Sequence, residues 1–365
     1  MTDPTTAAAS PDPVELLRSR RYLVLVVFGA VVGVLVAFVA YFFLKAISET
    51  QHYVFATLPG DVGYGTAPVW WPVPWLALSG LLVALTVRYL PGTAGHKPAE
   101  GFQAGGAVAP VDLPGIIIAA FATLSLGVVL GPEAPLIAIG NGLGVLALHL
   151  ARRGAPAQAS AMLGAAGSFA AISTLLGSPL AGAFLLMEAA PLGGPLRGVV
   201  LVPGLLAAGI GALIFVGLDS WTGFGTFSLA IPNIPHFGTP DGAEFLWAVA
   251  IGLAAAVLGG AIRRLSLLLQ AIVERRMVLL MPFVGLAIGG LAVLFQEGSS
   301  HSTSFVLFSG QDQLPSLIEG AADWSVGALM LLVACKGLAY CAALSSFRGG
   351  PVFPGMFIGA AGGLA

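Results

Sequence analysis

Long apolar runs, separated by short polar or Gly/Pro-rich turns, dominate the sequence. Several runs are too short to cross about 30 Å of hydrocarbon as single straight helices. They pair across breaks at 131–132, 177–179 and 350–351, and interrupted helices of this kind are typical of ion sites in transporters. The predicted helical runs lie near 22–44, 75–90, 112–131, 133–150, 157–176, 178–192, 196–218, 243–272, 277–295 and 326–346.

Composition identifies the class of protein. Of 365 residues, 57% are hydrophobic and 9% are charged, whereas a soluble domain carries about 25% charged residues. The 50 glycines and 25 prolines are typical of close-packed and interrupted membrane helices. The sequence therefore predicts an all-α polytopic membrane protein, a bundle of tilted and broken helices in the lipid bilayer.

Other partners find little support in the composition. The chain has no basic patch with interleaved aromatic residues, so no nucleic-acid partner is expected. Its two cysteines, Cys335 and Cys341, are interpreted as small apolar side chains of one helical run. We expect neither a cofactor nor a metal.

The order of the runs predicts two transmembrane halves. Proline-rich residues 219–242 read as an aqueous connection between them. The chain ends at Ala365, soon after an apolar helix begins, so the second half is expected to be incomplete, with a C-terminal truncation. The predicted divisions are a tail (1–21), a first half (22–218), the connection (219–242) and a second half (243–365).

Three arginines fix the expected orientation. Arg18, Arg20 and Arg21 stand directly before the first apolar run. Because positive residues tend to stay on the cytoplasmic side, the N-terminus is predicted to be cytoplasmic.

Glu133 is the most informative residue. It lies between Pro132 and Pro135, with apolar runs on both sides. A central acidic residue costs about 2.5–3.5 kcal/mol on membrane-insertion scales, so it persists where it has a role. Pro132 suits a helix break and restart, and the start of a helix stabilises an anion. We predict an anion site occupied by this tethered carboxylate; the alternative is a carboxylate that only caps its own helix.

Three further breaks contain candidate site residues. Successive backbone amides in 94–101 fit an anion-binding nest or an ordinary surface loop. In 177–188, Pro179 restarts a helix and Glu188 lies near its far end, either buried or at the aqueous face. The Gly-rich turn in 348–355 either offers amides to an anion or is a helix-packing turn.

Together these stretches resemble the CLC family of chloride channels and chloride/proton antiporters. Gly131-Pro132-Glu133-Ala134-Pro135 is similar to the family's Gly-Arg/Lys-Glu-Gly-Pro motif. Residues 177–188 resemble its Asn-Ala-Pro-Leu-Ala-Gly segment with the acidic residues that follow. Residues 345–354 resemble its Gly-x-Phe-x-Pro region with the preceding serines, and 94–98 lie where Gly-Ser-Gly-Ile-Pro is expected. The order and approximate spacing agree over most of 22–365.

The resemblance implies a CLC-like inverted repeat, a homodimer of the plasma membrane, and one anion pathway in each subunit. Glu133 is then the gating glutamate, which occupies an anion position when ionised and leaves it when protonated or displaced. The function implied is transport of chloride or a similar monovalent anion, with protons as an additional partner. The anion-binding residues expected from the motifs are Gly95, His96, Lys97, Glu133, Ala134, Val352 and Phe353.

The sequence departs from the family pattern at several of these positions. Gly95 stands where the family has a chloride-contacting serine, and His96 and Lys97 replace Gly and Ile. Pro132 replaces the basic residue before Glu133. Pro351 stands where a backbone donor is usual, which leaves Val352 and Phe353 as donors.

Two further departures concern proton coupling. The inner proton-transfer glutamate of the antiporters aligns with Ala189, which favours passive conduction, although Glu188 next to it is an alternative inner proton relay. The C-terminal tyrosine of the inner anion site would lie beyond Ala365.

Two other classes of protein agree with parts of the sequence. A non-transporting scaffold or sensor that keeps the CLC fold agrees with the absence of the serine and with Pro351. An intramembrane serine protease would use Ser168 in Gly167-Ser168, but Phe169 follows in place of the expected glycine. Neither His149 nor His301 has a spacing that identifies a base. We interpret Ser168 as a packing residue and do not expect an enzyme.

Overall fold

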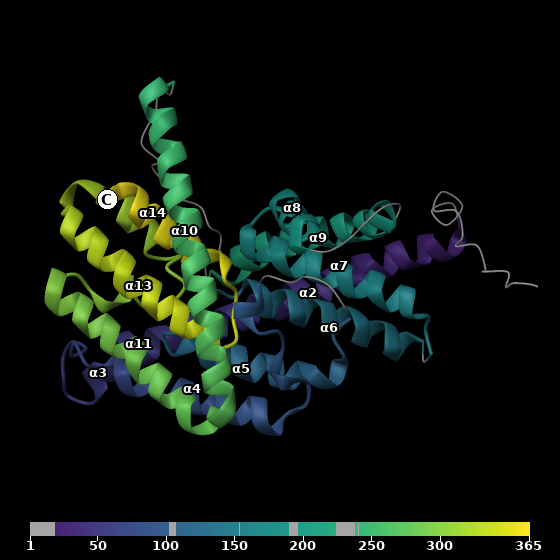
Figure 1. The fold of residues 1–365 in the computed structure, drawn as a ribbon. Coiled ribbons are helices and arrows are strands. Elements are labelled where there is room, and N and C mark those ends of the chain that lie inside the picture. The colour runs from purple at the N-terminus through teal and green to yellow at the C-terminus, as the bar shows by residue number, and fades with distance from the viewer. Residues whose placement is uncertain (1–18, 102–106, 153, 190–195, 224–237, 240) are drawn as a thin grey trace, which may run out of the picture. The chain divides into compact units, whose positions relative to one another are not determined.

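The computed structural model describes residues 19–101, 107–152, 154–189, 196–223, 238–239 and 241–365 (Figure 1). Over these residues the chain is almost entirely helical. Within the described residues, extended pairing is limited to one isolated antiparallel bridge, between Gly131 and Gly350. The predicted all-α class is confirmed.

The helices follow the predicted apolar runs closely. The α-helices are α2 (Arg20–His52), α3 (Leu58–Asp61), α4 (Pro72–Tyr89), α5 (Leu113–Ser125), α6 (Glu133–Ala151), α7 (Ala157–Leu176), α8 (Pro179–Ala189), α9 (Leu196–Thr222), α10 (Gly242–Val273), α11 (Met277–Ser299), α12 (Leu314–Glu319), α13 (Val326–Ser346) and α14 (Val352–Leu364). Short 3-10 or π-helical turns are η1 (Tyr53–Thr57), η2 (Pro91–Ala94), η3 (Pro98–Glu100), η4 (Pro110–Asp112), η5 (Glu274–Arg276), η6 (Thr303–Phe305) and η7 (Ala321–Asp323).

Two runs differ from the prediction in extent. The first helix continues to His52 instead of ending near residue 44, and its 33 residues correspond to about 50 Å at 1.5 Å per residue. The run expected over 112–131 is helical only to Ser125. After it the chain turns at Gly127, where φ is +95°, so an extended segment precedes Glu133.

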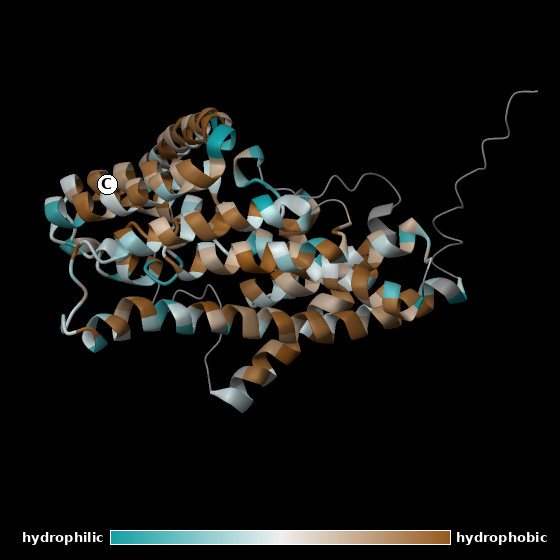
Figure 2. Cartoon of the chain, turned by 90° about the horizontal axis from the view of Figure 1, so that it is seen from below, coloured by the Kyte–Doolittle hydropathy of each residue, from teal (hydrophilic) through white to brown (hydrophobic). Residues whose placement is uncertain are grey.

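Seven helical stretches among the described residues are long and apolar enough to cross a bilayer. Figure 2 shows apolar colour along most of each helix and polar colour mainly at helix ends and turns. Of the shorter apolar helices α5, α8 and α14, α8 and α14 begin at the predicted breaks. Length and hydropathy together confirm a multi-span membrane protein.

The fold consists of two compact units. The described residues of 1–40, 104–110 and 139–226 form one unit, and those of 41–103, 111–138 and 227–365 form the other. The two sequence halves remain a prediction. Their tail and connection lie largely outside the described residues, at 1–18, 224–237 and 240.

In the first unit, α7 packs against α8 and α9. Most buried residues of α7 are Gly, Ala, Ser or Thr, and the larger ones include Phe169, which is 2% exposed. Ser168 is buried there, and its hydroxyl donates to the Gly164 carbonyl at 3.2 Å, as a packing residue does in a helix.

In the second unit, α11 packs closely against α4 and α13. A Cβ atom added at Gly80 would meet the backbone of Met281, and one at Gly285 would meet the backbone of Leu76. The hydroxyl of Ser79 donates to the Ala122 carbonyl at 2.8 Å and ties α4 to α5. Small residues therefore bring the backbones into contact, as is typical of membrane helices.

Local sequence signals mark where the helices α10 and α13 of this unit begin. At the start of α10, the Asp241 side chain accepts from the Glu244 amide at 2.8 Å, and Glu244 accepts from the Asp241 amide at 2.9 Å. This reciprocal pair is a capping box. The Ser325 hydroxyl accepts from the Ala328 amide at 3.1 Å and begins α13.

Candidate functional site: a buried carboxylate between two helix starts

Two glycines bring the starts of α6 and α14 together. The amide of Gly131 donates to the carbonyl of Gly350 at 2.8 Å, and the Gly350 amide donates back to the Gly131 carbonyl. Helices begin at Glu133 and at Val352, two residues after these glycines. Because the first four amides of a helix have no partner within it, the bridge gathers free N–H groups from two helices.

The Glu133 side chain lies between these helix starts and is fully buried. Its Oε1 accepts a hydrogen bond of 2.7 Å from the Phe353 amide. Its Oε2 is a buried acceptor without a hydrogen-bond partner among the described residues. The carboxylate therefore sits at the start of a second helix, α14, and not only at the start of its own.

The two glycines also leave room for the carboxylate. A Cβ atom added to Gly131 or to Gly350 would overlap Oε2 of Glu133. Glycine at both positions lets the peptide backbone approach the carboxylate closely.

Arg348 connects this bridge to the turn η2. Its guanidinium is buried, with the residue 6% exposed, and Nε and Nη2 each donate to the Thr93 carbonyl at 3.3 Å. Nη1 donates to the carbonyls of Ser346 and Phe347 at 3.4 and 3.2 Å. The Arg348 amide donates to Thr123 Oγ1 at 3.4 Å. One side chain thus fixes the turn before Gly350 against η2.

The turn that Arg348 binds has an unusual backbone. Four consecutive residues, Gly92 to Gly95, have φ of +74°, +49°, +59° and +89°. Thr93 and Ala94 carry side chains in this left-handed region, which costs on the order of 1–3 kcal/mol for each residue. The hydrogen bonds from Arg348 to Thr93 hold this turn in place.

The candidate residues Gly95, His96 and Lys97 follow that turn. The Gly95 amide donates to the Gly92 carbonyl at 3.0 Å. A ring nitrogen of His96 lies 2.8 Å from the Gly101 carbonyl, so that nitrogen carries a proton. The ammonium of Lys97 lies 2.6 Å from a carboxylate oxygen of Glu274. Both side chains have partners away from Glu133.

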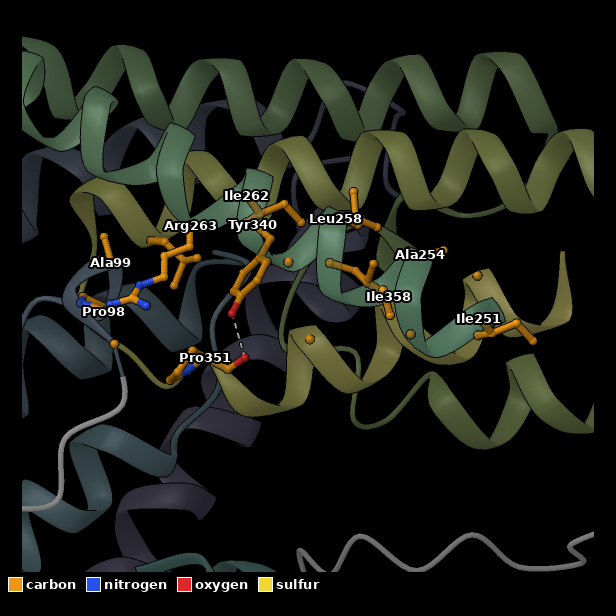
Figure 3. A pocket seen from close by; sticks show the side chains of 17 residues that line it. Pro98, Ala99, Ile251, Ala254, Leu258, Ile262, Arg263, Tyr340, Pro351 and Ile358 are labelled. Carbon is orange, nitrogen blue, oxygen red and sulfur yellow. Dashed lines mark hydrogen bonds between the residues drawn. The ribbon is translucent and has the colours of Figure 1, made fainter. Parts of the chain in front are cut away.

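A cavity of about 430 Å³ lies next to the start of α14 (Figure 3). Residues of α10, α13, α14 and the 98–101 turn line it, and most of them are apolar. Its polar side chains are Arg263 and Tyr340. The Tyr340 hydroxyl donates to the Pro351 carbonyl at 2.8 Å, directly before Val352 and Phe353.

No role for Tyr340 or Arg348 was predicted from the sequence. A tyrosine in an apolar helix and an arginine inside a Gly/Pro break could have been noticed in the sequence as unusual polar residues. Their hydrogen-bond acceptors are backbone carbonyl groups, however, and no sequence pattern identifies those. Two serines at the same turn are also buried: Ser345 Oγ donates to the Ala342 carbonyl at 2.7 Å and lies 2.8 Å from Ser346 Oγ.

The remaining candidates lie at helix ends. Ala134 and Val352 are in the first turns of α6 and α14. Glu188 is exposed on α8, in the first unit. Within the described residues, no three His, Cys, Asp or Glu side chains are grouped as metal ligands are.

Known proteins with similar sequences identify the family. The sequence profile described as "Voltage gated chloride channel" matches residues 79–365. A protein of Salmonella paratyphi A named "Putative ion-transport protein YfeO" is 31% identical over 356 residues, which cover 95% of this chain and 81% of that protein. The protein of the same name from Escherichia coli O7:K1 is 31% identical over 360 residues, which cover 95% of this chain and 80% of that protein.

Solved structures agree on the fold. The crystal structure of a slow cyanobacterial Cl−/H+ antiporter superposes with a TM-score of 0.71 at 18% identity, over 92% of this chain and 76% of that one. A CLC-type fluoride/proton antiporter gives a TM-score of 0.59 at 20% identity, over 92% and 79%. The predicted CLC-like fold is thereby confirmed, and the chain belongs to the voltage-gated chloride channel (CLC) family.

Proposed function

We propose that this protein carries chloride, or a monovalent anion of similar size, across the membrane. The observation that carries the proposal is the buried Glu133 carboxylate on the Phe353 amide, 2.7 Å away. A negative group at this place is stabilised by peptide dipoles alone, because no Lys, Arg or His nitrogen lies within 4.0 Å of it among the described residues. Weak binding by backbone dipoles suits a path through which ions must also leave.

Glu133 acts as the gate in this proposal. When ionised, its carboxylate competes with the transported anion for the amides at the start of α14. Protonation or displacement of the side chain frees those amides. The unpartnered Oε2 supports this role, because a buried acceptor with no donor is weakly held on that side.

The anion contacts proposed are backbone amides at three helix or turn starts. Val352 and Phe353 begin α14, and Ala134 lies in the first turn of α6. In the Gly95–Lys97 turn, the amides of His96 and Lys97 are the donors proposed, since the Gly95 amide is bonded to Gly92. The cavity beside Tyr340 and Pro351 is the proposed approach to the α14 start.

We propose passive conduction as the mode of transport, because Ala189 stands where the family's inner proton glutamate aligns. Exchange of the anion for protons is the second candidate. It is favoured by the two similar solved structures, which are proton antiporters, and it would use Glu188 as the inner relay.

The setting proposed is a homodimer in the plasma membrane, with the N-terminus in the cytoplasm. The family resemblance supports the dimer. The three arginines directly before the first apolar run, Arg18, Arg20 and Arg21, support the orientation.

The test is reconstitution of the purified protein in liposomes loaded with chloride. Anion efflux and the internal pH are recorded together. Anion efflux without proton movement is the expected result. Proton uptake driven by a chloride gradient would show that the protein exchanges anions for protons and does not conduct them passively. A folded protein that moves no anion would favour the scaffold or sensor class.

A further inference from the structure

Lys336 is a buried cation that the proposed gate does not use. It lies within the apolar helix α13 and has no exposed surface. Its Nζ lies 3.0, 3.1, 3.1 and 3.4 Å from the carbonyl oxygens of the four consecutive residues 305–308. The ring of Phe357 lies on another side, with its centroid 4.5 Å from Nζ. Among the described residues no carboxylate lies within 4.0 Å of this nitrogen.

These partners form a cage for a monovalent cation. An ammonium group has three donors and no acceptor, and here four carbonyl oxygens and an aromatic face surround it. Converging backbone carbonyls replace the hydration shell of an alkali cation, and an aromatic face attracts a cation in the same way. The carbonyls belong to the last residue of η6 and to the three residues after it, and carbonyl groups at the end of a helical turn lack partners within it.

The cage contacts both segments that hold Glu133. The Phe308 amide donates to the Gly127 carbonyl at 3.2 Å, and Gly127 begins the extended segment that leads to Gly131. Phe357 lies four residues after Phe353 on α14, and therefore on the same face of that helix. Both phenylalanines are buried, at 2% exposure or less.

We propose that Lys336 is a tethered cation that positions the two segments around Glu133, and that its cage of carbonyls binds a free monovalent cation when the side chain is removed. The gate would then have two tethered ions. A carboxylate is held by amides at one helix start, and an ammonium is held by carbonyls behind it. The part of this inference that concerns Glu133 rests on the proposed function; the cage itself does not.

The first experiment measures the cage. Wild type, K336A and K336M are purified, and their melting temperatures are recorded in the chloride salts of N-methylglucamine, sodium, potassium and methylammonium. Since the anion is constant, only cation binding differs. We expect K336A to melt lower than wild type in N-methylglucamine and to recover in potassium or methylammonium. Wild type should melt at the same temperature in all four salts.

K45M is the matched control. Lys45 also lies in an apolar helix but pairs with Glu49 in place of a carbonyl cage. Its melting temperature should not depend on the cation. A K336A melting temperature that is the same in all four salts, or a cation effect of equal size in K45M, would overturn the cage.

The second experiment measures the link to Glu133. In liposomes with N-methylglucamine on both sides, we expect K336A and K336M to lose most of their anion flux, because the two segments around Glu133 lose the ammonium that positions them, and to alter the pH profile of the remaining flux. Methylammonium on both sides should restore K336A but not K336M, whose side chain fills the space.

A second variant keeps the lysine, so that the positioning role can be tested even if the Lys336 variants do not fold. F357L removes the aromatic face and leaves a side chain of related volume, so it should shift the pH profile of flux. An F357L profile identical to wild type would overturn the positioning role. If the wild type itself moves no anion, the proposed function fails. The melting temperatures still show whether the carbonyl cage binds a cation.

Discussion

Glu133 and Phe353 are 220 residues apart in sequence, yet a carboxylate oxygen of the first accepts a 2.7 Å hydrogen bond from the backbone amide of the second. The contact joins the start of α6 to the start of α14. It places a negative group where the dipole of α14 is positive. A side chain thus occupies a position suited to a free anion, and this arrangement gives the predictions below.

E133Q is expected to remove most of the pH dependence of anion flux. Protonated Glu133 no longer competes as an anion, so wild-type flux should rise as pH falls, by at most about tenfold per pH unit for one titrating proton. The amide side chain of Gln keeps an acceptor for the Phe353 amide but cannot ionise. Flux measured from acidic to neutral pH checks this, and a Gln variant with the wild-type profile would exclude Glu133 as the gate.

G350A is expected to expel the carboxylate from its place. The added Cβ overlaps Oε2 of Glu133, so the folded state should lose about 1–3 kcal/mol, as overpacking does. Flux at neutral pH should approach that of E133A. In a double-mutant cycle, adding E133A to G350A should recover stability, with a coupling of about 0.5–3 kcal/mol.

G363A is the matched control for this cycle, because a Cβ at that position of α14 meets open space. Its stability should not depend on the residue at 133. A coupling as large as that of G350A would mean that the effect is general to the helix.

Y340F is expected to lower the free energy of unfolding by about 1 kcal/mol, because it leaves the partly buried Pro351 carbonyl without its donor. Chemical denaturation in detergent measures the loss. Y89F is the control, since Tyr89 is 70% exposed. Equal stability of Y340F and wild type would show that the hydroxyl does not hold the start of α14.

R348K is expected to destabilise the protein by about 1.5–3 kcal/mol, the range for hydrogen bonds to charged groups. A lysine ammonium cannot reproduce the planar fork that reaches Thr93, Ser346 and Phe347 at once. R264K, at an exposed arginine of α10, should change stability far less. Similar losses in both variants would argue against a specific role of Arg348.

K97M is expected to change anion flux by less than about threefold, because the Lys97 side chain forms a partly exposed ion pair with Glu274, and such pairs contribute little. The backbone amides of the turn, which are the proposed donors, remain. Flux in low and high salt measures the effect. A tenfold loss would place the ammonium itself in the anion path.

The sequence predicted the helices and the helix break before Glu133 well, for physical reasons. Apolar length sets the membrane helices, and Pro132 and Pro179 mark restarts that α6 and α8 follow. A lone carboxylate after a helix break is also a local signal.

The partners of the site could not be predicted in this way. The acceptor of Tyr340, the carbonyl groups around Lys336 and the Glu274 partner of Lys97 are brought together by tertiary packing. Backbone atoms carry no sequence signature, and pairs that are far apart in the chain have no fixed spacing. The pair of backbone hydrogen bonds between Gly131 and Gly350 could not be predicted for the same reason.

The separation of Glu133 from Phe353 also has a consequence for biosynthesis. At about 5–20 residues per second, the ribosome needs roughly 10–40 s to make the 220 residues between them. Throughout that time the nascent chain has made the acid but not the amide that receives it. An ionised acid in lipid is costly, so the newly inserted chain must keep Glu133 either protonated or in water until α14 arrives. Membrane insertion of the first segments therefore precedes formation of the Glu133–Phe353 hydrogen bond, and a chain that stops before Val352 would have the acid without the amide that binds it.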